Sequence, residues 1–343
     1  MDQKDLLSIP LYTYSLSRSF LYSFEFKLLQ KIFGEAPAGE QPTQEDFEKL
    51  QGQVIELFKQ DSRNIVDGIY PMQVLLPESP FNHIMRLPTL ITDALRSQKQ
   101  KKRRESKKFE KDNKYLEDKL PEYFKRNFHF QNQGYLSEES AVLYDHQVEM
   151  LFSGTANAMR RLLIQSLKKN GGYTSSSRIR ILELACGTGS SSRFLRMAFP
   201  NAHITMTDLS RPYLKTARER LKQDDNLDFL QADAAELPFK DESFDIVCSV
   251  FLFHEIPQDI RDKVIQESKR VLKIGGSMGH LDSIQLHDRP EFAVFLNNFP
   301  IEYHEPFFKN YIQHPLEEHI TKAGLQNIKT ELALLSKCVF STK

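Results

Sequence analysis

The sequence predicts an α/β fold with a doubly wound parallel sheet and a mainly helical N-terminal extension. First, the apolar run 181–184 (Ile-Leu-Glu-Leu) enters the turn Ala-Cys-Gly-Thr-Gly, and a helix-like segment follows it. Second, strand and helix patterns alternate regularly between residues 178 and 283. Third, the runs 326–335 and 337–342 alternate like two strands joined by a turn. Alternation of strands and helices is typical of parallel sheets that bind ligands at the carboxyl ends of their strands.

The composition of the chain excludes some classes of function and favours others. The 343 residues include 46 Lys and Arg against 46 Asp and Glu, so no bulk charge favours nucleic-acid binding. Apolar residues make up 40%, which is enough for a folded core. The three cysteines, Cys186, Cys248 and Cys338, are scattered without metal-type spacing, so we expect no metal centre. We find no signal-peptide pattern and no membrane-spanning run, and we therefore expect a cytoplasmic protein.

We divide the chain into a helical extension (1–112), a helical lid segment (113–172) and the sheet domain (173–343). In the extension, apolar spacing from Phe20 predicts an amphipathic helix ending near Gly34, and Thr43 caps a second helix over 45–59. The basic run 99–108 lies in a charged helical stretch. Acids follow it at once, which favours a solvated helix over a nucleic-acid site. Peripheral membrane contact by the apolar N-terminal helix stays open as an alternative.

The lid segment is rich in aromatic residues. Ser137 caps a helix that runs to Phe152, Gly154 interrupts it, and a further helix covers 155–168. Aromatic side chains of this segment would cover the site and exclude water. They are Phe124, Phe128, Phe130, Tyr135 and Tyr144.

Further elements follow in order along the sheet domain. We expect strands at 178–184, 203–208, 227–232, 244–250 and 277–283. Ser210 caps a helix with Pro212 in its first turn, and another helix spans 257–272 and ends at Gly275-Gly276. A last helix covers 315–324.

Two cofactors suit the strand ends. A dinucleotide fold needs Gly-x-Gly-x-x-Gly, and Ser192 occupies the third glycine position, so a nucleotide-dependent oxidoreductase is the weaker alternative. The other candidate is S-adenosylmethionine (SAM), whose ribose hydroxyls need an acceptor such as Asp208. Its ammonium group suits Glu183 and the carbonyl of Ala185, and its adenine amino group suits Asp233. Gly187 and Gly189 let the backbone approach the ligand closely.

Five segments in order resemble the successive motifs of class I SAM-dependent methyltransferases, closest to the ubiquinone/menaquinone C-methyltransferase type. This resemblance implies a seven-stranded Rossmann-like sheet with a C-terminal antiparallel hairpin, SAM as cofactor, and further cofactor contacts from Tyr144, Leu209, Ala234 and Ser249. The chain departs from that subgroup at Val148 and at Phe253-His254-Glu255, so the quinone substrate does not carry over. The segments are 181–189 (ILELACGTG), 207–210 (TDLS), 232–239 (ADAAELPF), 243–247 (SFDIV) and 270–276 (RVLKIGG).

We therefore expect a SAM-dependent methyltransferase acting on a small apolar or aromatic acceptor. His254 is the candidate base, oriented by Asp282 or Glu255, and a base is needed only if the acceptor loses a proton. Aromatic residues over 295–311 would form a second wall of the acceptor site. His254, Asp282 and Tyr144 have structural alternatives, and Asp233 would also suit a turn cap. A non-catalytic SAM-binding regulator is the remaining alternative, and the oligomeric state does not follow from the sequence.

Overall fold

A seven-stranded sheet forms the centre of the structure, a computed structural model. It describes residues 3–33, 39–76, 85–86, 88–93, 95, 113–117, 119–126, 128, 133–221 and 224–343. The strand order is β3-β2-β1-β4-β5-β7-β6, with β1 to β5 parallel and β7 antiparallel to both neighbours. This confirms the predicted sheet and its C-terminal hairpin. The strands are β1 (Arg180–Leu184), β2 (His203–Asp208), β3 (Leu227–Gln231), β4 (Phe244–Val250), β5 (Leu272–Ser283), β6 (Gln326–Ala333) and β7 (Ser336–Thr342).

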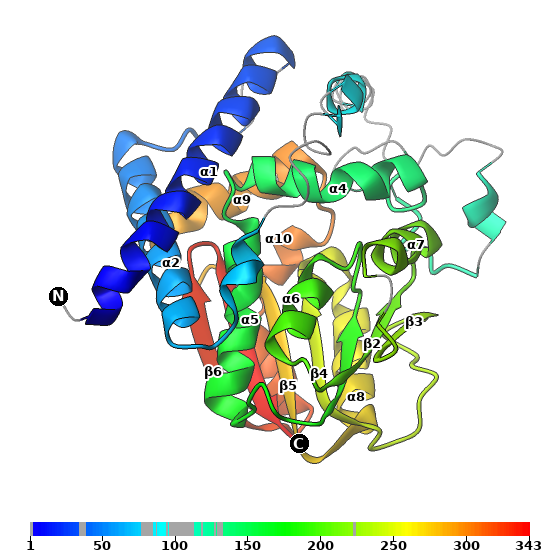
Figure 1. Cartoon of the computed structure of the whole chain (residues 1–343). Coiled ribbons are helices and arrows are strands. Elements are labelled where there is room, and N and C mark those ends of the chain that lie inside the picture. Colours follow the sequence, from blue (N-terminus) through cyan, green and yellow to red (C-terminus); the bar gives the residue numbers. More distant parts are fainter. Residues whose placement is uncertain are drawn as a thin grey trace.

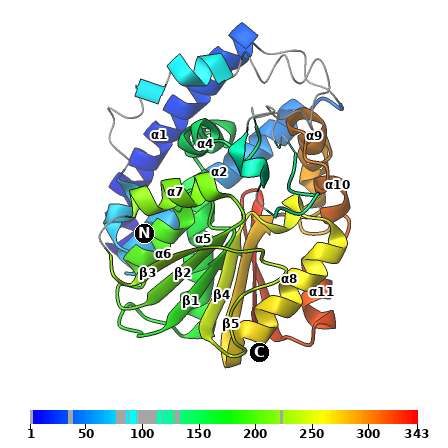
Figure 2. The same cartoon turned by 90° about the vertical axis from the view of Figure 1, so that its right-hand side faces the viewer.

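Helices cover both faces of this sheet and its carboxyl edge. In Figures 1 and 2, α5, α6 and α7 lie on one face, α8 and α11 lie on the other, and α4 and α9 cross above the strand ends. The α-helices are α1 (Gln3–Phe33), α2 (Gln44–Val66), α4 (Glu138–Leu151), α5 (Ala156–Gly171), α6 (Ser190–Ala198), α7 (Arg211–Arg220), α8 (Gln258–Val271), α9 (Ala293–Tyr303), α10 (Phe308–Tyr311) and α11 (Leu316–Lys322). The short 3₁₀ helices are η1 (Met72–Leu75), η2 (Lys114–Glu117), η4 (Phe253–Glu255) and η5 (Pro290–Phe292).

Each face of the sheet has its own buried core. Leu163 and Phe194 pack from α5 and α6 against one face, and Val264 and Ile320 pack from α8 and α11 against the other. All four side chains are at most 3% exposed. Burying such a side chain contributes about 1.5–3 kcal/mol, so the helices hold the carboxyl ends of the strands in a fixed arrangement.

Local signals placed several elements correctly. β4 has the predicted bounds, and the hydroxyl of Ser210 accepts from the backbone N–H of Tyr213 as the expected cap. The start of β5 differs, because the chain enters the strand at Leu272 directly after α8. Leu272 is fully buried and pairs with Phe244. The next pair is Ile246 with Ser277, so the register shifts between these two pairs and Gly275-Gly276 lie in the shifted part of β5. The helix predicted over 257–272 agrees with α8, but the chain is already in β5 at Gly275-Gly276, where the helix is expected to end.

The first helix packs only part of its apolar side chains against the rest of the protein. α1 begins at Gln3, well before Phe20, and Phe20, Leu21 and Phe24 are exposed. Buried Ser19 donates to the carbonyl of Ser153 at 2.6 Å. Gly154 allows this crossing, since a Cβ there would lie 3.0 Å from the Cα of Ser19. The predicted helix end near Gly34 is confirmed, since α1 ends at Phe33. The predicted apolar face is not buried at Phe20 and Phe24, and the small side chain of Ser19 lies on the inner side instead.

The second helix begins as predicted and is longer than predicted. Thr43 and Asp46 form a capping box at its start. α2 continues past residue 59 because its last turns are buried, including Asp61, which pairs with Arg161 of α5. The basic run 99–108 and Phe130 lie outside the described residues. No helix in the described part of the chain is both long and apolar enough to cross a bilayer.

Candidate functional site

The turn after β1 is held tightly against the end of β2 and against α7. Ala185, Gly187 and Gly189 all have positive φ angles, of 49°, 56° and 78°. The backbone N–H of Gly187 donates to Oδ2 of Asp208 at 2.8 Å. A Cβ at Gly189 would lie 3.1 Å from the Cβ of Ala217 on α7. These contacts explain the two glycines, and they fix the turn beside the end of β2.

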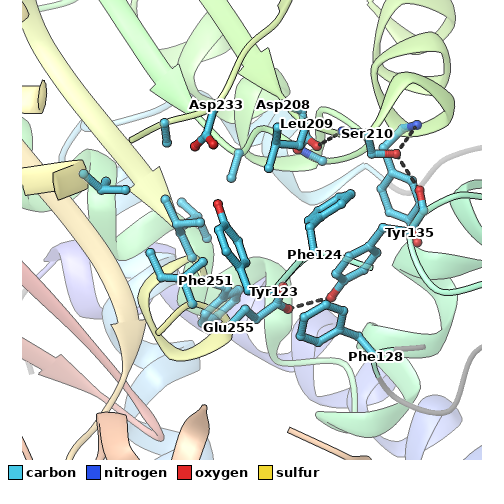
Figure 3. A pocket seen from close by; sticks show the side chains of 18 of the residues that line it. Tyr123, Phe124, Phe128, Tyr135, Asp208, Leu209, Ser210, Asp233, Phe251 and Glu255 are labelled. Carbon is cyan, nitrogen blue, oxygen red and sulfur yellow. Dashed lines mark hydrogen bonds between the residues drawn. The ribbon is translucent and has the colours of Figure 1, made fainter. Parts of the chain in front are cut away.

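A pocket opens at the carboxyl ends of β1, β2 and β4, and we call it the donor pocket. It encloses about 780 Å³, part of it open to solvent. In Figure 3, Asp208 and Asp233 lie along one wall, and the hydroxyl of Tyr123 points toward them from the opposite side. The predicted lid residues that line it are Phe124, Phe128, Tyr135 and Tyr144. The predicted cofactor residues that line it are Ala185, Gly187, Asp208, Leu209, Asp233 and Ala234.

The two aspartates already hold backbone N–H groups. Besides Gly187, Asp208 accepts from the N–H of Ser210 at 2.7 Å, and Asp233 accepts from the N–H of Ala235 at 2.9 Å. Asp233 is thus both a turn cap and a wall of the donor pocket. Burial raises the pKa of Asp208 to about 6 although these N–H groups oppose the shift. Asp208 is therefore mostly ionised at neutral pH and able to accept further hydrogen bonds.

Two predicted cofactor residues lie behind the pocket wall. Glu183 is 1% exposed and accepts a hydrogen bond from Ser192 Oγ. Burial, reinforced by the charge of Asp208, raises the pKa of Glu183 to about 8. Ser249 is fully buried and does not line the donor pocket, because its hydroxyl faces Nδ1 of His280 at 2.7 Å. The hydroxyl of Ser249 thus faces His280 on the paired strand β5, and the cofactor contact of Ser249 stays a prediction.

His254 and Asp282 form a buried dyad beyond β4 and β5. Nδ1 of His254 lies 2.6 Å from Oδ1 of Asp282, whose Oδ2 accepts from the backbone N–H of Phe253 at 2.7 Å. Burial disfavours the imidazolium, but the adjacent Asp282 carboxylate more than offsets this and raises the pKa of His254 to about 9. His254 Nε2 lies 3.9 Å from Oε1 of Glu255, so Asp282 is the closer of the two predicted orienting partners.

A second, larger cavity adjoins the donor pocket, and we call it the apolar chamber. It encloses about 1600 Å³, part of it open to solvent. Its walls come from α1, α2, α4 and α9, and His254 lies among the few polar residues. Residues of the predicted second wall that line it are Phe295, Phe299, Tyr303 and Phe308. Other apolar residues that line it include Phe26, Phe47, Leu50, Val148, Leu151 and Phe152.

Three residues line both cavities: Tyr144, Phe251 and Glu255. Tyr135 donates its hydroxyl to Oε1 of Glu255 at 2.6 Å, which Figure 3 shows as a dashed line. Phe251 has a φ of 58°, which is uncommon for a bulky residue and turns the chain sharply at the end of β4. The two cavities therefore meet at a junction of one carboxylate and two aromatic rings.

Sequence reasoning missed Phe251 and the contribution of the N-terminal helices to the site. Phe26, Phe47 and Leu50 lie about a hundred or more residues before the cofactor turn. No spacing in the sequence links them to it. Two groups of described residues place imidazole and carboxylate atoms within 4.8 Å of one another, His254 with Glu255 and Glu305, and His287 with Asp288 and Glu317. These two groups of side chains do not test the expectation that the protein has no metal centre.

Comparisons with known proteins identify the same methyltransferase domain that the five sequence motifs indicate. A sequence profile described as a methyltransferase domain matches residues 181–276. A demethylmenaquinone methyltransferase of Clavibacter sepedonicus is 44% identical over 139 residues, which are 40% of this chain and 53% of that protein. The ubiquinone/menaquinone biosynthesis C-methyltransferase UbiE of Ectopseudomonas oleovorans is 32% identical over 140 residues, which are 40% of this chain and 78% of that protein.

The chain spans about half the length of most of the curated relatives that it matches. A solved putative O-methyltransferase from Nostoc punctiforme has a TM-score of 0.46 at 16% identity. That match covers 62% of this chain and 61% of the other. A phosphoethanolamine N-methyltransferase from Haemonchus contortus, solved with S-adenosyl-L-methionine, has a TM-score of 0.38 at 24% identity. It covers 50% of this chain and 38% of the other.

Proposed function

We propose, since this chain belongs to the class I SAM-dependent methyltransferases, that it transfers a methyl group from SAM to an apolar or aromatic acceptor held in the apolar chamber. The observation that carries the proposal is the junction of the two cavities at Tyr144, Phe251 and Glu255. SAM supplies an electrophilic methyl group on a sulfonium. Holding the acceptor in line with that methyl and away from water is the main catalytic task of the protein.

The residues of the donor pocket fit the chemical groups of SAM. Asp208 would accept from the ribose hydroxyls, and Asp233 would accept from the adenine amino group, because both carboxylates face the pocket. The carbonyl of Ala185, which lines the pocket, and Glu183, which lies behind its wall, would bind the ammonium group. The aromatic side chains Tyr123 and Phe124 would cover the nucleoside and exclude water, as expected for a lid.

The lining of the apolar chamber supports the acceptor class. Phe47, Leu50, Phe295 and Phe299 are among its apolar lining residues, and His254 lies beside Glu255 of the junction. Such a space suits a molecule with a large apolar body and one polar reactive end. The relatives' names refer to menaquinone and ubiquinone, which belong to this class. The departures at Val148 and at 253–255 leave the individual acceptor open.

His254 is the group we propose to take a proton from the acceptor. It lines the apolar chamber, and Asp282 holds its Nδ1, so Nε2 is the atom available to the acceptor. Only the neutral imidazole can accept that proton, and a pKa of about 9 keeps most of the free protein protonated at neutral pH. A sulfonium in the adjoining pocket would favour the neutral form by charge repulsion.

The test is incubation of the purified protein with methyl-labelled SAM and apolar extracts, followed by isolation of the labelled product. A matched pair of variants separates acceptor binding from donor binding. Phe299→Ala, in the apolar chamber, should raise the acceptor KM about tenfold with an unchanged SAM KM. Leu332→Ala, exposed on β6, should change neither. Label transfer only to polar acceptors would contradict the acceptor class. SAM binding without transfer to any acceptor would favour the regulatory alternative.

A further inference from the structure

The outward side of α1 exposes a row of large apolar side chains. Phe20 is 75% exposed, and Leu21, Phe24 and Leu28 are 49%, 58% and 47% exposed. At about 100° per residue, these four positions fall within about 100° of one another around the helix axis. Leu6, about five turns before Phe24, lies on the same side and is also exposed. We call these five residues the outer row, and a patch of this kind indicates a contact surface.

The opposite side of α1 already packs against the rest of the protein. Ser15, about half a turn around the axis from Phe24, is buried, and Ser19 is buried beside it. Tyr12 and Leu16 pack against the cluster formed by α2 and α5. α1 is therefore attached through one side, and the outer row is a second apolar side that faces away from the protein.

The exposed charges beside the outer row are positive. Lys27 and Lys31 are exposed, and each lies less than one turn from a member of the row. The two acids of α1 point to the protein instead, because Asp5 pairs with α2 and Glu25 pairs with α4. Apolar side chains with lysines at their edge are complementary to a bilayer that contains anionic lipids. The apolar groups enter the interface and the ammonium groups stay at the headgroups.

The inner side of the same helix forms a wall of the apolar chamber. Phe26 lies about 200° around the axis from Phe24 and lines the chamber. In Figures 1 and 2, the C-terminal half of α1 lies beyond the carboxyl ends of the strands, on the same side as α4 and α9. A bilayer against the outer row would therefore lie next to the chamber wall. If the proposed function holds, an apolar acceptor would have a short path from the bilayer into the chamber.

We propose that the outer row of α1 docks the protein on the surface of a bilayer that contains anionic lipids. α1 lies in the plane of the interface, with Phe20, Phe24 and Leu28 among the upper acyl chains and Lys27 and Lys31 at the headgroups. The helix does not span the bilayer, since no described helix is long and apolar enough to do so. This contact goes beyond the proposed function and does not depend on it.

The experiment is sedimentation of the full chain with two kinds of vesicle. One is phosphatidylcholine alone, and the other contains about one-third phosphatidylglycerol. We expect about tenfold tighter binding to the anionic vesicles at low salt, and a smaller preference as the ionic strength rises. The double variant Phe20→Ser, Phe24→Ser should weaken binding to both kinds of vesicle about tenfold or more. Ile274→Ser, at a 78% exposed apolar residue near the start of β5, should leave binding unchanged.

A charge variant tests the second part of the contact. Lys27→Glu with Lys31→Glu should remove the preference for anionic vesicles and leave the weaker binding to neutral vesicles. All four altered positions in the two double variants are exposed, so we expect the variants to fold, which circular dichroism and thermal melting check.

Three outcomes would overturn the docking proposal. They are an unaltered protein that binds neither vesicle, a phenylalanine variant that binds as well as the unaltered protein, and a dimer in sedimentation velocity that the phenylalanine substitutions abolish while no vesicle is bound. The last result would assign the outer row to a second copy of the chain. Because vesicle binding is measured without SAM or acceptor, its failure would leave the proposed methyl transfer standing, and the reverse also holds.

Discussion

The imidazole of His254 lies 2.6 Å from the buried carboxylate of Asp282, and this pair sets the expected pH dependence of the reaction. With the pKa of His254 near 9, the neutral imidazole increases as the pH rises, so single-turnover rates should rise between pH 6 and 9. His254→Ala should lower turnover about 100-fold or more and leave SAM affinity nearly unchanged.

Asp282→Asn tests whether the negative charge of Asp282 sets the pKa of His254. Removing the carboxylate removes the main influence that raises the pKa, so the rising limb of the profile should move to lower pH. His287→Ala, on a half-exposed histidine outside the chamber lining, should leave the profile unchanged. A rate that stays flat from pH 6 to 9 would return His254 to a structural role.

The raised pKa of Glu183 leads us to expect that a proton is released when SAM or its product binds. Burial raises its pKa to about 8, so roughly nine-tenths of the free protein carries this proton at pH 7. An ammonium group beside Glu183 favours the carboxylate and lowers that pKa. Calorimetry of S-adenosylhomocysteine binding in buffers of different ionisation enthalpy should show nearly one proton released at pH 7 and almost none at pH 9.

Glu183→Gln is the control for this proton. It should abolish the release while the chain remains folded, because Gln can still accept from Ser192. Proton uptake on binding would contradict the assignment of Glu183 to the ammonium group.

Asp208 should decide the choice between the two cofactor classes. Asp208→Ala removes the expected acceptor of the ribose hydroxyls, at a cost on the order of 2–3 kcal/mol in SAM affinity. The unaltered protein should bind SAM and S-adenosylhomocysteine at micromolar strength and NAD negligibly, since Ser192 replaces the third glycine of the dinucleotide pattern. Titrations in which NAD binds more tightly than SAM would refute the cofactor assignment.

Local signals in the sequence account for most of the sheet domain. A glycine turn, the Ser210 cap and the β-branched run of β4 act over a few residues, so their patterns predict structure directly. The orientation of Ser249 does not follow from such signals, because it depends on the pairing of β4 with β5 and on His280.

The packing of the N-terminal helices also depends on tertiary contacts that sequence patterns do not reveal. The exposed apolar side chains of α1, such as Phe20 and Phe24, mimic the pattern of a buried face. Phe47 and Leu50 of α2 join the apolar chamber through long-range packing, which leaves no trace in sequence spacing. Arg160 and Arg161 are adjacent in the chain and have different surroundings, which only the tertiary structure distinguishes.

A buried ion pair between Asp61 and Arg161 connects α2 of the N-terminal extension to α5. Asp61 of α2 accepts from Nε and Nη2 of Arg161 at 2.7 and 2.6 Å, and both side chains are at most 4% exposed. Tyr70 donates to the same carboxylate at 2.7 Å. Removing one member of a buried pair leaves the other charge without compensation, which costs about 3–5 kcal/mol.

We therefore expect Asp61→Ala to lower the free energy of unfolding by about 3 kcal/mol or more, as measured by urea denaturation. Asp67→Ala, on the partly exposed pair with Lys4 at the end of the same helix, should cost no more than about 1 kcal/mol. By the same argument, a chain that begins at Lys114 loses this pair and a wall of the apolar chamber, and it should be less stable than the full chain. Equal stability of the Asp61 and Asp67 variants would show instead that α2 is a loosely attached appendage.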